Sequence, residues 1–342
     1  MNRTIEKSKI KNQDQVTHTD MEYECSSQCP KEYMVVIQCA TYNQEKFIGQ
    51  TLESIVSQQT NFPFIVVVVD DASTDNNVNV IQEYEAKYPN IVKAIYLTEN
   101  HYRIRKSKYP YFREWVNKSK YVAYCEGDDF WTDPHKLQKQ VDFLESHPDY
   151  NLVCHNWNVL QDGKILPSPV HHLYTQPMSF TFATLPWVWI TKTLTMMYRR
   201  SAVDQDSFVK FKYSRDVHIV YFALKEGQGY YMPEIMATYR VVDSGIWSKV
   251  DQNKKNFITY DLYKDLYSQE PYKSVRKRYM NATLAYFNGL AFGKKTWWHF
   301  HTNIKLYIEA LRNISDIKDS VFCVGGLVPT RLVKWVMKTF KV

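Results

Sequence analysis

The sequence of 342 residues predicts an α/β fold in which a mainly parallel sheet is flanked by helices and followed by a helical extension. From residue 34 to residue 97, apolar runs rich in β-branched residues alternate with segments of helical periodicity. Two of the apolar runs end abruptly in acidic residues, at the edge where such sheets bind their ligands. Beyond residue 251 the pattern becomes largely helical.

The first part of the chain reads as consecutive βα units. Residues 34–39, M-V-V-I-Q-C, predict a buried strand, and Asn43 is the expected N-cap of the following helix. Residues 64–69, F-I-V-V-V-V, predict a second strand, which is followed by another helix and by a third strand at residues 91–97.

The later elements are expected in a less regular order. They are a strand at 121–125, a helix with Asp133 as N-cap and Pro134 at its first position, strands at 152–155 and 191–200, a helix at 215–226 and a strand at 229–242. Residues 161–186 are rich in proline and polar residues, so we expect an irregular connection there.

The net charge of +7 is unevenly distributed. Beyond residue 250 there are 16 Lys or Arg against 7 Asp or Glu, which indicates an anionic partner for that part. No nucleic-acid recognition module accompanies these charges, so an anionic membrane surface is the expected partner. Near the end, Arg331, Lys334, Lys338 and Lys341 share one helical face opposite apolar residues, as in interfacial helices.

The remaining features predict a cytoplasmic protein, peripheral to the membrane if it meets one. Residues 1–30 are polar and lack an apolar core, so we expect a disordered leader and no signal peptide. No run approaches the ~20 apolar residues of a membrane helix. The six cysteines lack the spacing of a disulfide framework and are interpreted as reduced thiols.

Two acidic clusters carry the chemistry. Glu126, Gly127, Asp128 and Asp129 follow the strand at 121–125, and Asp70 and Asp71 follow the strand at 64–69. Adjacent carboxylates at a strand end suit Mg²⁺ or Mn²⁺ held together with substrate phosphates. The alternative for each cluster is an ordinary turn that ends a strand and caps a helix.

Between residues 100 and 120 lie seven Lys or Arg and one acid, Glu114. This run is either a solvated helix face or a source of cations, from Arg103, Arg105 or Lys106, that balance phosphate charge near the acidic clusters.

Three ordered motifs resemble the family 2 glycosyltransferases of the GT-A (Rossmann-like) fold, particularly the bacterial members that build surface polysaccharides. They are A-T-Y-N-Q-E-K-F-I at 40–48, V-V-D-D-A-S-T-D at 68–75 and E-G-D-D-F-W-T-D-P at 126–134. The similarity continues more weakly through Y-S-R-D-V-H at 213–218 and Y-R-V-V-D-S-G-I-W-S at 239–248, and it does not reach the tail.

The resemblance implies roles for individual residues. Ala40, Tyr42 and Glu45 would line the nucleotide pocket, and Asp71 would contact the base. Asp128 would lie by the ribose and diphosphate and Asp129 would bind Mn²⁺ or Mg²⁺, with the order of these two left open. Asp216 would be the general base, unless it is only an N-cap. Arg240, unless it forms a structural ion pair, and Trp247 would complete the donor site.

Two positions depart from the pattern of the family. Arg215 stands where many relatives have Glu, and Val242 stands where relatives often have His, so the donor and metal contacts made there are in question. Trp189, Thr193 and Thr195 lie in the segment that would face the acceptor, although Trp189 is equally consistent with the core.

The resemblance implies an inverting, metal-dependent transferase that moves a sugar from a nucleotide sugar, expected to be a UDP-hexose, to a saccharide or lipid-linked saccharide. The alternatives are a nucleotidyltransferase and a non-catalytic nucleotide-sugar-binding or scaffold subunit. The expected domains are the leader at 1–30, the GT-A domain at 31–250 and a basic, membrane-associating helical extension at 251–342.

Overall fold

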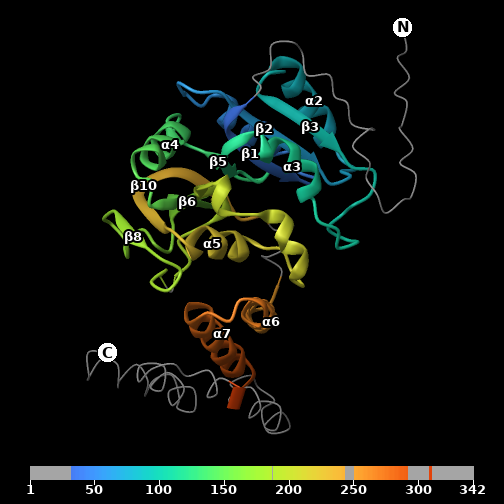
Figure 1. Cartoon of the computed structure of the whole chain (residues 1–342). Helices are drawn as coiled ribbons and strands as arrows, with labels where there is room; N and C mark the ends of the chain where they lie inside the picture. The colour runs from blue at the N-terminus through green and yellow to red at the C-terminus, as the bar shows by residue number, and fades with distance from the viewer. Residues whose placement is uncertain (1–31, 187, 243–249, 292–307, 310–342) are drawn as a thin grey trace.

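The computed structural model describes residues 32–186, 188–242, 250–291, 308 and 309 (Figure 1). The first half is built from βα units, as the alternating pattern predicts. Its elements are β1 (Tyr33–Thr41), α1 (Ile48–Val56), β2 (Phe64–Asp70), α2 (Asn77–Lys87), β3 (Val92–Tyr96), α3 (Tyr109–Asn117) and β4 (Ser119–Tyr124). β2 pairs in parallel with β1 and β3, and β4 pairs in parallel with β1, so the carboxyl ends of all four strands share one edge.

The second half extends the same sheet with strands of both directions. Its elements are β5 (Phe130–Trp131), α4 (Lys136–Ser146), β6 (Tyr150–Gln161), β7 (Lys164–Pro167), β8 (Met178–Phe180), β9 (Met197–Arg199), α5 (Asp216–Lys225) and β10 (Gln228–Arg240), with short 3₁₀ segments η2 (Thr193–Thr195), η3 (Arg200–Ala202) and η4 (Gln205–Lys210). The strand order is β3-β2-β1-β4-β9-β6-β10-β5. β9 is antiparallel to both β4 and β6, and it joins the two halves.

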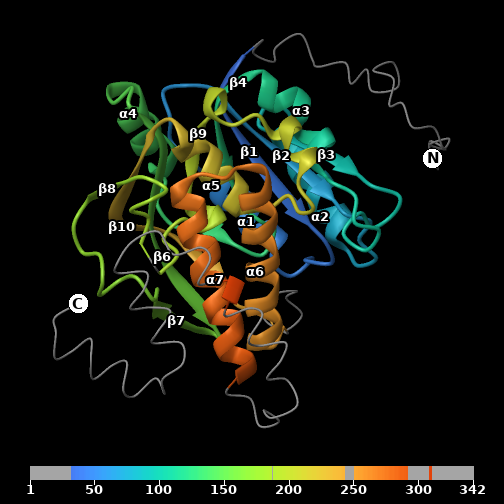
Figure 2. The same ribbon diagram turned by 60° about the horizontal axis from the view of Figure 1, so that its bottom comes forward.

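Two long helices follow the sheet: α6 (Gln252–Gln269) and α7 (Lys273–Ala291). Figure 2 shows them side by side next to α5. Their buried side chains, which include Tyr263, Leu266 and Tyr279, belong to the same core cluster as Phe208 and Tyr221. The helical extension is therefore packed on the sheet domain, and the expected division at residue 250 stays a prediction.

Two predicted helix starts were wrong. Asn43 is not an N-cap, because α1 begins at Ile48, and Asn43 has a φ of +51° and accepts a hydrogen bond from Thr74 N at 2.7 Å. Asp133 does not cap α4, which begins at Lys136; its carboxylate accepts from His135 N at 2.8 Å and from Lys139 Nζ at 2.6 Å. At Asn43 a contact with the loop after β2 holds the chain in a turn, and at Asp133 local contacts with the following residues do so, and in both places the helix begins later.

The strand expected at residues 191–200 is much shorter, because η2 occupies its first part and only β9 is extended. The connection expected at 161–186 contains β7 and β8. The leader, most of the basic tail with its interfacial helix, and Trp247 lie outside the described residues. Cys39, Cys125 and Cys154 are buried free thiols, as expected.

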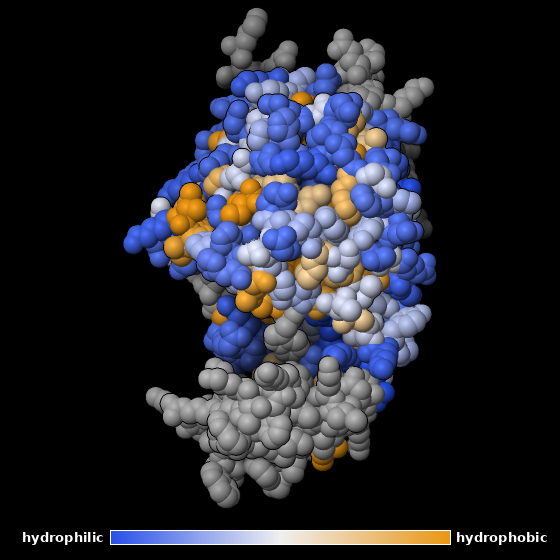
Figure 3. Space-filling view, turned by 90° about the vertical axis from the view of Figure 1, so that its left-hand side faces the viewer, coloured by the Kyte–Doolittle hydropathy of each residue, from blue (hydrophilic) through white to orange (hydrophobic). Residues whose placement is uncertain are grey.

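Among the described residues, no helix combines the length and apolar character needed to cross a membrane. Figure 3 shows one face of the molecule, on which apolar side chains form several small groups among hydrophilic ones. Scattered apolar groups of this kind are ordinary on protein surfaces.

Candidate active site

The acidic turn, residues 126–129, connects β4 to β5 at the carboxyl edge of the sheet. It is fastened to the neighbouring elements through its backbone. Gly127 N donates to Ala40 O at 3.1 Å, and the Thr51 hydroxyl on α1 donates to the carbonyls of Gly127 and Asp129 at 3.0 and 2.7 Å. The end of β1 and the first helix therefore set the position of the turn.

Gly127 is required by close packing. A Cβ atom at this position would lie 2.6 Å from Thr41 Oγ1 and 2.7 Å from Thr41 Cβ. Such distances force the backbone to shift, because real Cβ atoms essentially never approach other atoms so closely. A larger residue here would displace the carboxylates on either side.

Arg240, at the end of β10, binds the acidic turn through two hydrogen bonds. Its backbone N donates to Asp129 Oδ1 at 2.8 Å, and its Nε donates to Asp128 O at 2.8 Å. The guanidinium also donates to Gln50 Oε1 at 2.6 Å and lies over the rings of Phe47 and Phe130. Much of its hydrogen-bonding capacity thus positions the turn, and among the described residues its guanidinium forms no ion pair within 4.0 Å, so the structural ion pair considered from the sequence is not seen.

The carboxylates of the acidic turn are buried close to one another, and their charges repel. Burial raises the pKa of Glu126 to about 7, and the nearby charges of Asp128 and Asp216 add to the shift, while a hydrogen bond from Thr193 opposes it. Burial also raises the pKa values of Asp128 and Asp129. A cation between these groups would favour their ionised forms.

A divalent cation fits the turn when substrate oxygens complete its coordination. Asp129 is 2% exposed and one of its oxygens already accepts from Arg240, whereas Asp128 is only partly buried. The described residues contain no group of three or more His, Cys, Asp or Glu side chains arranged to hold a metal. Asp128 and Asp129 are the residues of the turn that could hold Mg²⁺ or Mn²⁺, together with phosphate oxygens of a substrate.

Asp216 is the first residue of α5, and it faces the acidic turn from the other half of the molecule. Its Oδ1 accepts from Val217 N at 2.9 Å, and the N-cap of α5 is Arg215. Burial raises the pKa of the Asp216 carboxyl, with opposing effects from Val217 N and Lys192. A partly buried carboxylate with a raised pKa is well suited to accept a proton.

Lys192 completes this set, and sequence reasoning missed it. The charges of Asp129, Asp216 and Glu126 act on its ammonium. The ammonium lies 3.8 Å from the ring centroid of Tyr239, the residue before Arg240, whose N donates to Asp129 Oδ1 at 2.8 Å. Burial lowers the pKa of Lys192, and these three charges oppose that effect. The sequence feature that could have indicated Lys192 is its place between Thr191 and Thr193, in the segment expected to face the acceptor.

The second acidic cluster lies at the end of β2 and is engaged by the protein itself. Asp71 is 2% exposed; its carboxylate accepts from His101 N at 2.7 Å, Tyr102 N at 3.2 Å and Lys108 Nζ at 3.0 Å. Asp70 accepts from Ser73 N at 2.8 Å and from Asn77 Nδ2 at 2.7 Å. Asp71 therefore holds the loop after β3, and little of its capacity remains for a base.

The other residues expected at the nucleotide site lie near this edge. Tyr42 is half-buried, and its hydroxyl accepts from Arg103 Nη2 at 3.2 Å. Glu45 is exposed; its carboxylate accepts from Asn76 N at 2.8 Å and its own N donates to Asp75 at 3.0 Å. Arg105 and Lys106 are exposed, as a solvated face requires.

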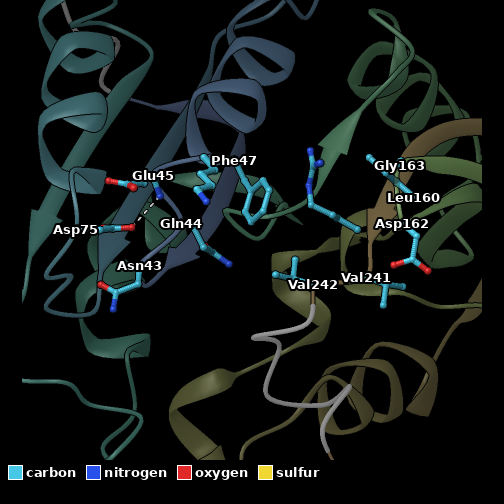
Figure 4. Close-up of a pocket in the computed structure, with 12 residues that line it drawn as sticks. Asn43, Gln44, Glu45, Phe47, Asp75, Leu160, Asp162, Gly163, Val241 and Val242 are labelled. Carbon is cyan, nitrogen blue, oxygen red and sulfur yellow. Dashed lines mark hydrogen bonds between the residues drawn. The ribbon is translucent and has the colours of Figure 1, made fainter.

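A cavity of about 550 Å³ opens beside the acidic turn. Figure 4 shows Gln44, Glu45 and Phe47 on one side and Asp162 and Val242 on the other. Arg240 also lines it. The cavity therefore lies between the loop after β1 on one side and the β6–β7 hairpin and the end of β10 on the other.

Of the three residues expected to face the acceptor, one contacts the acidic turn and two are held within the protein. Thr193 reaches Glu126, whereas Thr195 is buried and its hydroxyl donates to Lys192 O at 2.8 Å. Trp189 is partly buried and packs against the main core cluster.

Comparison with known proteins identifies the family. The model of "Glycosyl transferase family 2" matches residues 37–208, a span that contains the acidic turn, Asp71 and Lys192. The chain belongs to glycosyltransferase family 2. The resemblance read from the three motifs is thereby confirmed.

Relatives within this family include both named and uncharacterized proteins. Over 219 residues the chain is 32% identical to the uncharacterized protein Rv1520 of Mycobacterium tuberculosis, covering 64% of this chain and 61% of that protein. It is 28% identical over 235 residues to the putative teichuronic acid biosynthesis glycosyltransferase TuaG of Bacillus subtilis, covering 66% and 87%. It is 28% identical over 122 residues to the dTDP-rhamnosyl transferase RfbG of Shigella flexneri, covering 35% and 40%.

The fold of this family 2 chain is also seen in solved structures. The crystal structure of S. aureus TarS 1–349 in complex with UDP-GlcNAc superposes with a TM-score of 0.55 at 16% identity, covering 82% of each chain. This similarity confirms the α/β, GT-A-like fold.

Proposed function

We propose that this chain is an inverting, metal-dependent glycosyltransferase that moves a hexose from a UDP-sugar to a saccharide acceptor during surface-glycan synthesis. One observation carries the proposal. Lys192 lies over Tyr239, next to Arg240, whose N donates to Asp129 Oδ1 at 2.8 Å, and the charges of Asp129, Glu126 and Asp216 all act on its ammonium. This supports a site in which the proposed metal ligands and the proposed base lie near one lysine. Inverting transfer needs this arrangement, because the nucleophile and the leaving group lie on opposite sides of the anomeric carbon.

In this proposal Asp128 and Asp129 hold Mn²⁺ or Mg²⁺, and the greater accessibility of Asp128 favours it as the main ligand. The cation would neutralise the charge that develops on the departing diphosphate. Arg240 keeps both aspartates in place through its contacts with the turn. Ala40, Tyr42, Glu45 and Asp71 line the nucleotide side, where Asp71 orders the loop after β3.

Asp216 acts as the general base on the acceptor side. It takes the proton from an acceptor hydroxyl as that oxygen bonds to the anomeric carbon. The bond from that carbon to the phosphate oxygen breaks, and its electron pair leaves with UDP. The raised pKa of Asp216 makes this carboxylate a stronger base than a solvated aspartate.

The substrate assignment rests on similarity. TarS binds UDP-GlcNAc in a structure of the same fold, and TuaG is named for teichuronic acid biosynthesis. We therefore propose a UDP-hexose donor and a saccharide or lipid-linked saccharide acceptor. In this proposal the enzyme works on the cytoplasmic side of the membrane, with the basic segment near residues 331–341 on an anionic lipid surface.

The test is turnover of nucleotide sugars by the purified full chain with Mn²⁺, measured as release of the nucleoside diphosphate. The panel contains UDP-glucose, UDP-galactose, UDP-GlcNAc, dTDP-rhamnose and GDP-mannose. Asp216→Asn should lower kcat by about 10²- to 10⁴-fold, because it removes the base. The matched control is Asp142→Asn on the exposed face of α4, which should leave kcat unchanged.

Other outcomes separate the alternatives. Wild-type turnover in Asp216→Asn would remove the base assignment. Metal-dependent UDP binding without turnover of any donor would favour a scaffold subunit, and pyrophosphate release from a nucleoside triphosphate would favour a nucleotidyltransferase.

A further inference from the structure

Lys192 lies among the carboxylates described above, and its ammonium is not engaged by any of them directly. Among the described residues its ammonium forms neither an ion pair within 4.0 Å nor a direct hydrogen bond, although three carboxylates act on it electrostatically. It lies over the ring of Tyr239, 3.8 Å from the ring centroid. An ammonium has three donors, so this one is held in place by an aromatic face with its donors left for a ligand.

The position of Lys192 indicates which part of a ligand it meets. Asp129 marks the diphosphate end of the site and Asp216 marks the acceptor end, and the Lys192 ammonium lies within the influence of both. In a transfer reaction, the sugar ring lies between the diphosphate and the acceptor. This step rests on the proposed function, since it takes the roles of Asp129 and Asp216 from there.

A complementary acceptor lies beside it. Glu126 Oε2 is buried and has no hydrogen-bond partner among the described residues. The charge of Glu126 acts on Lys192, and Thr193, the residue after Lys192, donates a hydrogen bond to Glu126, so this acceptor and the Lys192 donors lie near each other in the fold. The nearby Arg215 is exposed, and its side chain has only hydrogen-bond donors, so it cannot accept a hydrogen bond from the sugar as Glu126 can. Sugar hydroxyls both donate and accept, so a hexose ring satisfies both groups.

We propose that Lys192 binds a hydroxyl group of the transferred hexose, with Glu126 accepting from the same or the neighbouring hydroxyl, and that Lys192 thereby sets the choice of donor sugar. Lys192 is thus a specificity residue for the sugar and makes no contact with the nucleotide. A site of this kind discriminates strongly against donor sugars that lack the contacted hydroxyl, because their binding leaves a polar group of the site without a hydrogen-bond partner.

The experiment compares the affinity for a nucleotide sugar with that for the bare nucleotide, so it does not depend on turnover. Isothermal titration with Mn²⁺ measures binding of UDP and of the preferred UDP-hexose from the panel to the full chain. Lys192→Met removes the charge and keeps the length of the side chain. It should weaken binding of the UDP-hexose about tenfold or more and leave UDP binding within about twofold, since one charge-assisted hydrogen bond is lost. The control is Lys164→Met on the exposed strand β7, which should change neither affinity.

The contrary outcomes are distinct. An equal loss for UDP and UDP-hexose would mean that Lys192 contacts the diphosphate or that the site has collapsed, and unchanged binding of both would mean that it contacts neither; each overturns the inference. A wild-type chain that binds no nucleotide would overturn the proposed function, and this inference with it.

Donors with one sugar hydroxyl replaced by fluorine give a second readout. The wild type should lose affinity when the contacted hydroxyl is replaced, and Lys192→Met should lose little more for that donor, since the two changes remove the same interaction. Additive losses at every position would contradict the contact.

Discussion

At the scale of single residues, the position of the acidic turn depends on the absence of a side chain at residue 127. Thr41 on β1 occupies the space that a Cβ would need, and the backbone of Gly127 is bonded to Ala40. Asp128 and Asp129 follow directly, so any shift of this backbone carries both carboxylates with it.

Gly127→Ala should therefore lower the free energy of unfolding by about 1–3 kcal/mol, as overpacking does, and should weaken Mn²⁺-dependent UDP binding. Chemical denaturation and isothermal titration measure the two effects. The matched control is Gly49→Ala on α1, where the new Cβ meets only Val80 Cγ1, at 3.6 Å. That change should stabilise the protein by up to about 1 kcal/mol. Equal effects of the two substitutions would show that crowding at Thr41 is unimportant.

At the scale of elements, α4 holds η2, the segment that follows Lys192. Gln140 Nε2 donates to Thr195 O at 2.9 Å, and Trp131 Nε1 donates to Leu194 O at 3.0 Å. Behind them Lys136 is 0% exposed, donates to Gln140 Oε1 at 2.8 Å and lies over the Trp131 ring. A buried lysine thus supports the segment on which the site depends.

Burial lowers the pKa of Lys136 to about 7 from 10.5. Between these two values the unfolded chain binds more protons than the folded one, so the free energy of unfolding should rise with pH. The slope from pH 7 to pH 9 should approach about 1.4 kcal/mol per pH unit from this group. Denaturant unfolding across this range measures it. Lys136→Met should remove the slope, whereas Lys139→Met, at an exposed position of α4, should keep it. A slope that persists in Lys136→Met would assign it to other groups.

β2, β4 and the acidic turn could be predicted from the sequence because each is encoded locally, by an apolar run that ends in carboxylates. β7, β8 and the short β9 could not, because their runs carry no such signal. The start of α1 could not, because Asn43 accepts a hydrogen bond from Thr74, which is distant in the sequence. The start of α4 was placed too early because Asp133 accepts hydrogen bonds in a turn that precedes the helix. Lys192 was missed for the same reason as the start of α1. It lies over Tyr239 and is acted on by the charges of Glu126, Asp129 and Asp216, and only the folded sheet brings these residues near one another.

At the scale of the whole molecule, the two C-terminal helices are tied to the sheet domain through Glu270, at the end of α6. This residue is 6% exposed and accepts from Lys210 Nζ at 2.8 Å, Lys225 Nζ at 3.0 Å and Tyr221 OH at 3.0 Å. Burial alone would raise the pKa of the carboxyl, but these three donors outweigh it and the pKa is lowered.

Glu270→Gln should lower the free energy of unfolding by about 2 kcal/mol at pH 7, because it weakens three hydrogen bonds to a charged acceptor. The wild type has this contribution above the usual carboxyl pKa of 4.5 and loses it as the pH falls below that value, so the difference between the two proteins should shrink there. Denaturant unfolding at pH 7 and pH 4 measures it. Glu99→Gln, in an exposed pair with Lys106, is the control and should cost less than about 1 kcal/mol. A constant difference at both pH values would contradict the charged network.

The C-terminal helices also lie near Asp216. Tyr263 on α6 is buried close enough to Asp216 for that carboxylate to help burial raise the pKa of its phenol. Asp216 therefore lies near α6, and both Asp216 and α6 are outside the residues that the family model matches. Under the proposed mechanism, exchange of C-terminal segments between family members should thus change the pKa of Asp216. A working chimaera would have to inherit Tyr263 and Glu270 together with the α5 and η4 residues they meet.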